Sequence, residues 1–313
     1  MPSKQTNNIK PNNIKSNISQ SSLSNKSQNI QQLTTIRDFI RYGLTQFNSH
    51  DLYFGHGTDN SWDEIIALIT HTLKININPD NSDDSGNSWQ ADILPHLLDA
   101  KLLASEKELL FNKIQQRVSE RIPLAYLINQ TYFCDLEFYV DKRVIIPRSP
   151  IAELIQNQFS PWIGAGNTQA EDIHSILDLC TGSGCIAIAL AYYFPNANVD
   201  AIDLSDDALE ITKINIKNHK TKNNIKNKIT PIKSDLFNNL AKNKKYDLII
   251  SNPPYVNQQD LDSMPAEYHH EPRMALEAGK DGLELVDRIL KDAIQFLNPD
   301  GLLIVEVGNS QYD

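Results

Sequence analysis

The residues with the clearest chemical potential are Asn252, Pro253, Pro254 and Tyr255, which directly follow the apolar run 246–251. An amide or aromatic amine nitrogen is a poor nucleophile because its lone pair is delocalised. The side-chain carbonyl of Asn252 can accept one N–H of such a group, and Pro253 can offer a rigid backbone carbonyl to the other. Tyr255 can stack on the planar group. This arrangement favours group transfer to a planar nitrogen through positioning and partial charge stabilisation. The alternative is a plain Pro-Pro turn after a strand.

A glycine-rich segment, Thr181-Gly182-Ser183-Gly184, follows Asp178 at the end of a second apolar run and opens an apolar helix. Glycine lets the backbone turn sharply and approach a ligand with no side chain between them. The N-terminus of the helix presents free N–H groups and a partial positive charge. This combination suits a carboxylate such as the methionine end of S-adenosylmethionine, and it predicts cofactor binding by these five residues.

Acidic residues stand at the ends of two further apolar runs. Asp203 can accept hydrogen bonds from both hydroxyls of a ribose. Asp235 can accept the amino group of an adenine, whose ring Phe237 can flank. Together with Asp178, these acids make a purely structural glycine turn the weaker interpretation.

The same glycines leave a second enzyme class open. Gly182, Gly184 and Ala187 fit the dinucleotide fingerprint, and Asp203 lies about 20 residues further on, as that fingerprint requires. A nicotinamide-dependent enzyme is therefore an alternative from this motif alone. The segment 252–255 decides against it, because a dehydrogenase has no need of it.

The stretch 173–313 alternates strands with helices, which predicts an α/β fold with a Rossmann-like parallel sheet covered by helices on both faces. The predicted strands are 176–179, 199–203, 229–234, 246–251 and 302–307, and the predicted helices are 185–194, 206–218 and 283–297. Ligands on such sheets lie beyond the carboxyl ends of the strands. The residues described above stand at those ends, so we expect one site there.

The N-terminal part has a different character. Residues 1–33 are rich in Asn, Ser, Gln and Lys and predict a disordered low-complexity tail. Residues 34–130 predict a small helical domain for substrate recognition, with helices starting at capping boxes 61–64 and 105–108 and a further helix over 89–103.

Residues 131–172 predict a hairpin and linker between the two domains. Aromatic and β-branched residues favour strands over 132–140 and 144–146, joined by a turn at 141–142. The glycines and proline of 160–172 are typical of a loop.

The composition indicates a soluble protein that binds a basic partner. The net charge is −10, and the tail carries four lysines and no acid, so the remainder carries −14. An acidic body repels phosphate backbones, which argues against direct recognition of nucleic acid. The charge has a second interpretation, which is that it only keeps the enzyme soluble.

The chain has no apolar run near the roughly 20 residues needed to span a bilayer, so no membrane association is expected. Cys134, Cys180 and Cys185 lack metal-ligand spacing, and such sparse cysteines are typical of the reducing cytosol. We therefore expect a cytoplasmic protein.

From about residue 34 to the end, the chain resembles the HemK-like protein N5-glutamine methyltransferases, which are S-adenosylmethionine-dependent class I methyltransferases. Of their two bacterial branches, one modifies release factors and the other modifies the third protein of the large ribosomal subunit. The chain is similar to the second branch in the segments Phe54–Glu64, Arg121–Tyr126, Pro147–Ile151 and Glu267–Pro272.

This resemblance implies roles for particular residues. Asn252 to Tyr255 would hold the glutamine, while Asn252, the Thr181–Gly184 loop, Asp203 and Asp235 would hold the cofactor. Pro147 and Arg148 would wall the substrate entrance. His269 and His270 would belong to a loop over the active site, and with no third ligand nearby they predict no metal site.

Several alternatives stay open beside this resemblance. A release factor is the first alternative substrate. A DNA adenine amino-methyltransferase uses the same four-residue motif, but the chain has no target-recognition domain. An inactive cofactor-binding adaptor is the third. Because methyltransferases of this class add two more strands after the fifth, we also expect that the C-terminal strands of the sheet are missing from this sequence.

Overall fold

The computed structural model describes residues 30–75, 95–164, 169–308 and 311. The helices and strands follow one another as α2 (Ile36–Asn48), α3 (Ser61–Thr72), η2 (Pro95–Leu97), α4 (Ala104–Ser119), α5 (Leu124–Ile128), β1 (Thr131–Phe133), β2 (Leu136–Phe138), α6 (Ile151–Gln156), η3 (Ala170–Asp172), β3 (Ser175–Leu179), α7 (Cys185–Tyr193), β4 (Asn198–Asp203), α8 (Asp206–Lys222), β5 (Ile229–Lys233), β6 (Tyr246–Ser251), α9 (Gln258–Ser263), η4 (Ala266–His270), η5 (Arg273–Ala275), α10 (Glu284–Ala293) and β7 (Leu297–Val305).

The predicted parallel sheet is confirmed. Its strands lie in the order β5-β4-β3-β6-β7, and every neighbouring pair is parallel. Leu179 at the end of β3 pairs with Ile202 in β4 and with Ser251 in β6. The carboxyl ends of these three strands are therefore level, and the residues that follow them meet at one edge.

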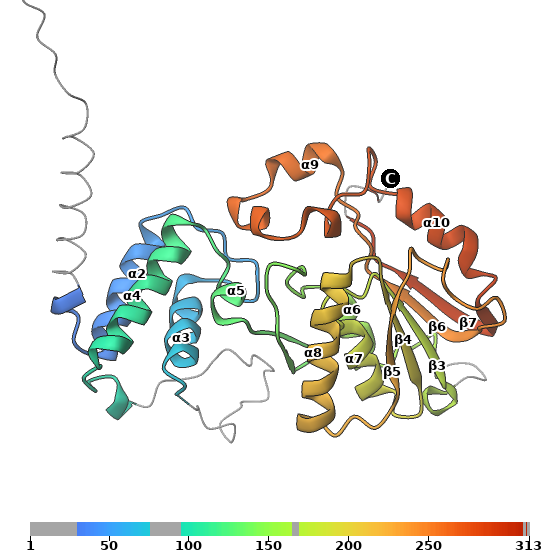
Figure 1. The fold of residues 1–313 in the computed structure, drawn as a ribbon, viewed down its shortest axis with the longest axis horizontal. Helices are drawn as coiled ribbons and strands as arrows, with labels where there is room; N and C mark the ends of the chain where they lie inside the picture. Colours follow the sequence, from blue (N-terminus) through green and yellow to red (C-terminus); the bar gives the residue numbers. More distant parts are fainter. Residues whose placement is uncertain (1–29, 76–94, 165–168, 309–310, 312–313) are drawn as a thin grey trace, which may run out of the picture.

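Helices cover both faces of the sheet, as Figure 1 shows for α7 and α10. Successive strand residues point to opposite faces, so each strand contributes to two cores. Ile176 packs with α6 and α7, whereas Leu177 packs with Ile289 of α10. The strands are apolar on both sides because both sides are covered.

Helices α2 to α5 form a separate core beside the sheet (Figure 1). Phe39, Phe47 and Leu110 are completely buried in it. Leu33, which the sequence assigns to the tail, is also buried there, with 4% of its surface exposed. Residues 30–32, also predicted as part of the disordered tail, are helical, and residues 1–29 lie outside the described residues.

The helix starts differ from those predicted. Asn60, not Ser61, caps α3, and its side chain accepts the N–H of Asp63. Glu64, predicted as the partner in that capping box, is instead buried and paired with Arg117.

The predicted cap of the next helix is also displaced. Helix α4 begins at Ala104, and Glu106 rather than Glu108 accepts the backbone N–H that precedes the helix. The predicted helix 89–103 is wrong over its described part, because 95–97 forms a 3-10 turn and Leu102 bonds to the backbone of Thr34. Residues 89–94 lie outside the described residues.

The hairpin is much shorter than predicted. Strands β1 and β2 pair around a two-residue turn at Cys134 and Asp135, both of which have positive φ. Turns with this backbone match the twist of the paired strands. Val144 and Ile146 are buried against α8 without pairing in a sheet, which is why their apolar pattern resembles a strand.

Further elements differ from the sequence prediction, and the helix predicted over 283–297 ends at Ala293. A short helix, α6, and the 3-10 turn η3 occupy parts of the segment predicted as hairpin and loop. Strand β7 begins at Leu297 rather than 302, because Leu297 pairs with Tyr246 before an irregularity in the register.

Candidate active site

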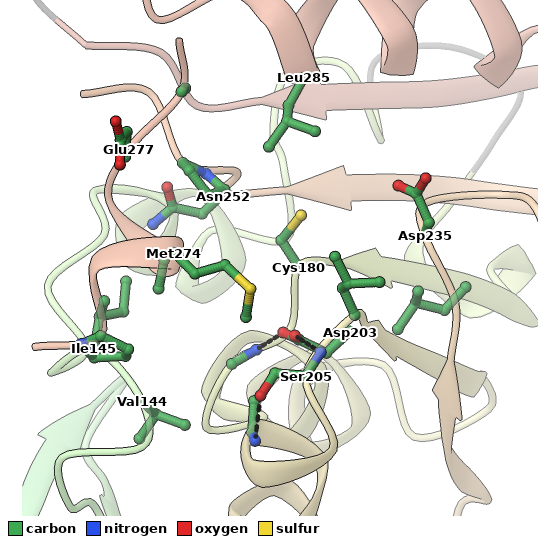
Figure 2. A pocket seen from close by; sticks show the side chains of 18 of the residues that line it. Val144, Ile145, Cys180, Asp203, Ser205, Asp235, Asn252, Met274, Glu277 and Leu285 are labelled. Carbon is green, nitrogen blue, oxygen red and sulfur yellow. Dashed lines mark hydrogen bonds between the residues drawn. The ribbon is translucent and has the colours of Figure 1, made fainter. Parts of the chain in front are cut away.

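A cavity of about 570 Å³ opens at the level carboxyl ends of the strands. This volume falls in the range of small-molecule sites, roughly 300–1,000 Å³. Figure 2 shows the side chains of Cys180, Asp203, Asn252 and Met274 around one hollow. The structure thus brings together side chains from β3, β4, β6 and the segment after β6.

The two glycines of the loop do different work. Gly182 lines the cavity with φ of +55°, and a Cβ placed on it would meet nothing within 4 Å. Gly184 has φ of +80°, and its Cβ would lie 2.9 Å from the Thr212 side chain. Gly182 therefore leaves room for a ligand, whereas Gly184 lets α7 start close against α8. Thr181 and Ser183 between them are buried and do not line the cavity.

Asp203 faces the cavity with a fixed orientation. One carboxylate oxygen accepts the N–H of Gly182 at 2.9 Å, and the other accepts the N–H of Ser205 at 2.9 Å. Burial raises the pKa of Asp203, although these backbone hydrogen bonds oppose the shift. Each oxygen retains a lone pair for a ligand, so the residue can accept from two neighbouring hydroxyls.

Asp178 supports the loop from beneath rather than lining the cavity. It is completely buried, accepts the hydroxyl of Thr181, and accepts the N–H of Ala187 at 3.1 Å. Its other oxygen has no hydrogen-bond partner among the described residues. Burial raises the pKa of Asp178 to about 7.

This raised pKa predicts a pH-dependent stability that Asp178→Asn should remove. The pKa of an unfolded aspartate is about 3.9. The contribution of the neutral carboxyl to the stability of the protein is thus fully present below about pH 4 and is lost as the pH rises through about 7. Between pH 5 and pH 8, the unfolding free energy of the wild type relative to the variant should fall by roughly 2–3 kcal/mol. Urea unfolding without cofactor measures this difference. Parallel curves of unfolding free energy against pH for the two proteins would contradict the prediction.

The third predicted acid, Asp235, lines the cavity, but it already has a partner. Both of its oxygens lie 2.7 Å from a guanidinium nitrogen of Arg288 on α10. The prediction for Phe237 needs correction. Phe237 is buried and stacks on Phe296 in the core at 4.8 Å, and Leu236 lines the cavity in its place.

A second, smaller cavity of about 120 Å³ adjoins the first. Asn252 and Pro254 line both cavities, and Pro253 and Tyr255 line the smaller one. Among the residues that the structure describes, none forms a hydrogen bond with the Asn252 side chain. This amide is therefore available to a ligand at the boundary between the two spaces.

Tyr255 is held by a residue that the sequence did not single out. Its hydroxyl donates to Glu306 at 3.0 Å, and the other oxygen of Glu306 accepts the hydroxyl of Ser149. Burial raises the pKa of both Tyr255, to about 12, and Glu306. The position of Glu306 directly after an apolar strand was the available signal.

The predicted substrate entrance is partly as expected. Arg148 lines the smaller cavity, whereas Pro147 is buried and lines neither. The guanidinium of Arg148 donates to both oxygens of Glu271, at 2.6 and 2.8 Å, and lies 5.0 Å above the Tyr268 ring. The Arg148 side chain is thus a fixed part of the wall of the smaller cavity.

The segment after α9 forms the remaining wall of the larger cavity, and the sequence motifs did not predict most of its residues. Met274, Glu277 and Gly279 line the larger cavity. Backbone hydrogen bonds of 2.9 Å join Val256 to Leu276 and to Ala278, so this wall is tied directly to the chain that leaves the Asn252–Tyr255 motif.

Chemically, the site offers an anchored acceptor for hydroxyls in the larger cavity and an unpaired amide at the boundary of the smaller one. Within the parts of the chain that the structure describes, no group of three or more His, Cys, Asp or Glu residues is placed to hold a metal ion. The geometry suits transfer between two bound molecules that meet beside Asn252.

Comparison with known proteins identifies close relatives. The family model "Methyltransferase small domain" matches residues 166–269. A ribosomal protein uL3 glutamine methyltransferase of Francisella tularensis is 46% identical over 90% of this chain and 83% of its own length. Its namesake in Neisseria gonorrhoeae is 45% identical over 91% of this chain and 87% of its own length.

Solved structures are more distant. A methyltransferase from Pyrococcus furiosus is 18% identical, covers 66% of this chain and 80% of its own, and has a TM-score of 0.38. That similarity is too low to support a conclusion about this chain.

Proposed function

Because this chain belongs to the family of ribosomal protein uL3 glutamine methyltransferases, we propose that it methylates the side-chain amide nitrogen of a glutamine in uL3. The methyl donor is S-adenosylmethionine. The observation that carries the assignment to particular residues is the place of Asn252, which lines both the larger and the smaller cavity. We assign the larger cavity to the cofactor and the smaller one to the glutamine.

The residues of the larger cavity fit this cofactor. Asp203 presents two oriented oxygens, which suits the two hydroxyls of a ribose. The open space beside Gly182 lets a ligand approach the backbone at the start of α7. Asp235 remains the proposed acceptor for the adenine amino group, with Arg288 holding its carboxylate in place.

In the smaller cavity, the chain's own residues position the substrate. The Asn252 side-chain carbonyl accepts one N–H of the glutamine amide, and the backbone carbonyl of Pro253 accepts the other. Tyr255, held by Glu306, packs on the planar amide. These contacts orient the nitrogen lone pair toward the larger cavity.

The chemistry then needs little else from the protein. When bound, S-adenosylmethionine supplies an electrophilic methyl group on a sulfonium. The amide NH₂ becomes NHCH₃ and releases one proton, and the carbonyls of Asn252 and Pro253 stabilise the positive charge that develops on the nitrogen.

The partner and location follow from the substrate. We propose that the acidic body, with a net charge of −14 outside residues 1–33, favours a basic ribosomal protein over nucleic acid. We also propose that the enzyme acts in the cytoplasm. None of the described helices is both long and apolar enough to cross a membrane.

A methyl-transfer assay tests this proposal. The full chain is incubated with methyl-labelled S-adenosylmethionine and, in separate reactions, purified uL3, a release factor and adenine-containing duplex DNA. We expect label in uL3 alone, on one glutamine located by peptide mass spectrometry. Preferential labelling of the release factor or the DNA would select one of the alternatives, and no label on any substrate would favour a cofactor-binding adaptor.

A further inference from the structure

Glu267 connects the active-site segment to the helical part of the molecule. One of its oxygens accepts from the backbone N–H of Tyr53 at 3.1 Å, from Arg117 at 2.9 Å and from Arg121 at 2.9 Å. The other accepts from Arg121 at 3.1 Å. The Glu267 side chain is completely buried by these partners.

These contacts belong to a charge cluster that is balanced. Arg117, with 1% of its side chain exposed, lies between Glu64 and Glu267 and also donates to the carbonyl of Tyr53 at 2.7 Å. Burial raises the pKa of Glu64. For Glu267, burial acts in the same direction, but hydrogen bonds from Arg121 and Arg117 outweigh it and lower the pKa to about 2. Two carboxylates thus face two guanidiniums, and removing one leaves a buried charge unmatched.

The residue next to Glu267 forms part of the substrate wall. Tyr268 lines the smaller cavity and lies under the guanidinium of Arg148. Arg148 is held further by the carboxylate of Glu271, which also accepts the N–H of Ile146 at 2.9 Å, and the backbone N–H of Glu271 donates to the carbonyl of Tyr268 at 3.1 Å. The anchor and the cavity wall are therefore adjacent in one short segment.

The helical part has no direct place in either cavity. Among the described residues, those that line the two cavities all lie at position 142 or later. Figure 1 shows α9 and the turns that follow it placed between the helical part and the sheet. Within the described residues, any effect of the helical part on the chemistry has to pass through segments such as this one.

We infer that Glu267 is a positioning residue for methyl transfer, which fixes the Tyr268 and Arg148 wall of the glutamine site by anchoring residues 264–271 to Arg117 and Arg121. The inference rests on the proposed function. It explains why Glu267 touches no cavity and yet follows the catalytic motif so closely. It also assigns a task to Glu64 and Glu267, neither of which lines a cavity.

The test is Glu267→Gln, which keeps the shape and removes the charge. We expect kcat/KM for uL3 to fall at least about tenfold, while the Kd for S-adenosylmethionine stays within about threefold. Cofactor affinity is spared because the wall of its cavity is tied to Val256 by backbone bonds. Hydrogen exchange should increase in residues 264–271 and not in β3, β4 or β6.

Two further variants calibrate the result. Arg121→Met leaves the bond from Arg117 in place and should have a smaller effect in the same direction. Asp99→Asn removes an exposed carboxylate of the helical part, 71% exposed and paired with Arg37, and should change neither parameter.

Three outcomes would overturn the inference. The first is a folded Glu267→Gln protein with wild-type kcat/KM and unchanged exchange in 264–271. The second is a parallel loss of cofactor affinity and transfer. If Glu267→Gln does not fold, Arg121→Met decides, and wild-type kinetics and exchange in that variant are the third. If the wild type itself transfers no methyl group to uL3, the proposed function has failed, whereas the exchange measurement still tests the anchoring by Glu267.

Discussion

Asn252→Ala should reduce methyl transfer to uL3 by about 10²–10³-fold, the effect typical of removing one preorganised hydrogen-bonding group from an active site. Asn252 lies where the two cavities meet, and its side chain forms no hydrogen bond with another described residue. Its truncation removes the acceptor that orients the glutamine amide and breaks no side-chain hydrogen bond among the described residues. Single-turnover kinetics with saturating S-adenosylmethionine measure the effect on transfer.

The control for Asn252→Ala is a matched substitution away from the site. Asn157→Ala changes an exposed residue at the end of α6 that lines neither cavity, and it should transfer methyl groups at the wild-type rate. A well-folded Asn252→Ala protein that methylates uL3 within tenfold of the wild-type rate would exclude the proposed role.

Asp203→Ala should weaken binding of S-adenosylmethionine by roughly 10²–10⁴-fold. The substitution removes the acceptors for two hydroxyls, and hydrogen bonds to a charged group contribute about 1.5–3 kcal/mol each. It also frees the N–H groups of Gly182 and Ser205, which loosens the loop around the cavity. Isothermal titration calorimetry measures the change in Kd. The Kd of Asp203→Asn, which keeps one acceptor oxygen, should lie between the Kd of the wild type and that of Asp203→Ala.

The matched control is Asp206→Ala, three residues further on. Asp206 is 70% exposed, pairs with Lys233 and does not line the cavity, so its loss should leave the Kd within about twofold. Unchanged affinity in Asp203→Ala would refute the ribose assignment. Tight binding of NADH by the wild type would instead support the dinucleotide interpretation of the glycine loop.

The sheet could be predicted from sequence because its strands are covered on both faces. Such strands are nearly continuous apolar runs, and the prediction 246–251 matches β6 at both ends. The level ends of three strands then place Asp203 and Asn252 at one edge without further information. In this region, local pattern and tertiary environment impose the same requirement on each residue.

The hairpin could not be predicted in this way. Val144 and Ile146 have the alternating pattern of a strand but are buried against a helix without pairing. An alternating pattern of apolar and polar residues indicates that one side of an extended segment is buried, but it does not indicate which element covers that side. The actual turn depends on positive φ at Cys134 and Asp135, and neither residue is a glycine.

The direction of side chains within a turn was the second feature that could not be predicted from the sequence. Leu236 and Phe237 are neighbours after β5, and only the backbone conformation, with φ of +47° at Leu236, decides which faces the cavity. The partners of Glu267 were equally hidden, since Arg117 and Arg121 stand about 150 residues earlier. The family resemblance pointed to the segment Glu267–Pro272, but the sequence alone does not indicate which residues this segment contacts.

The second cavity, to which we assign the glutamine, is small. Its volume of about 120 Å³ is roughly a fifth of the volume of the larger cavity, about 570 Å³. We expect the end of one unbranched side chain to enter this space more readily than a bulkier planar group. We therefore expect the target glutamine to lie on a narrow, exposed segment of its protein, so that its side chain can enter the smaller cavity without the neighbouring backbone.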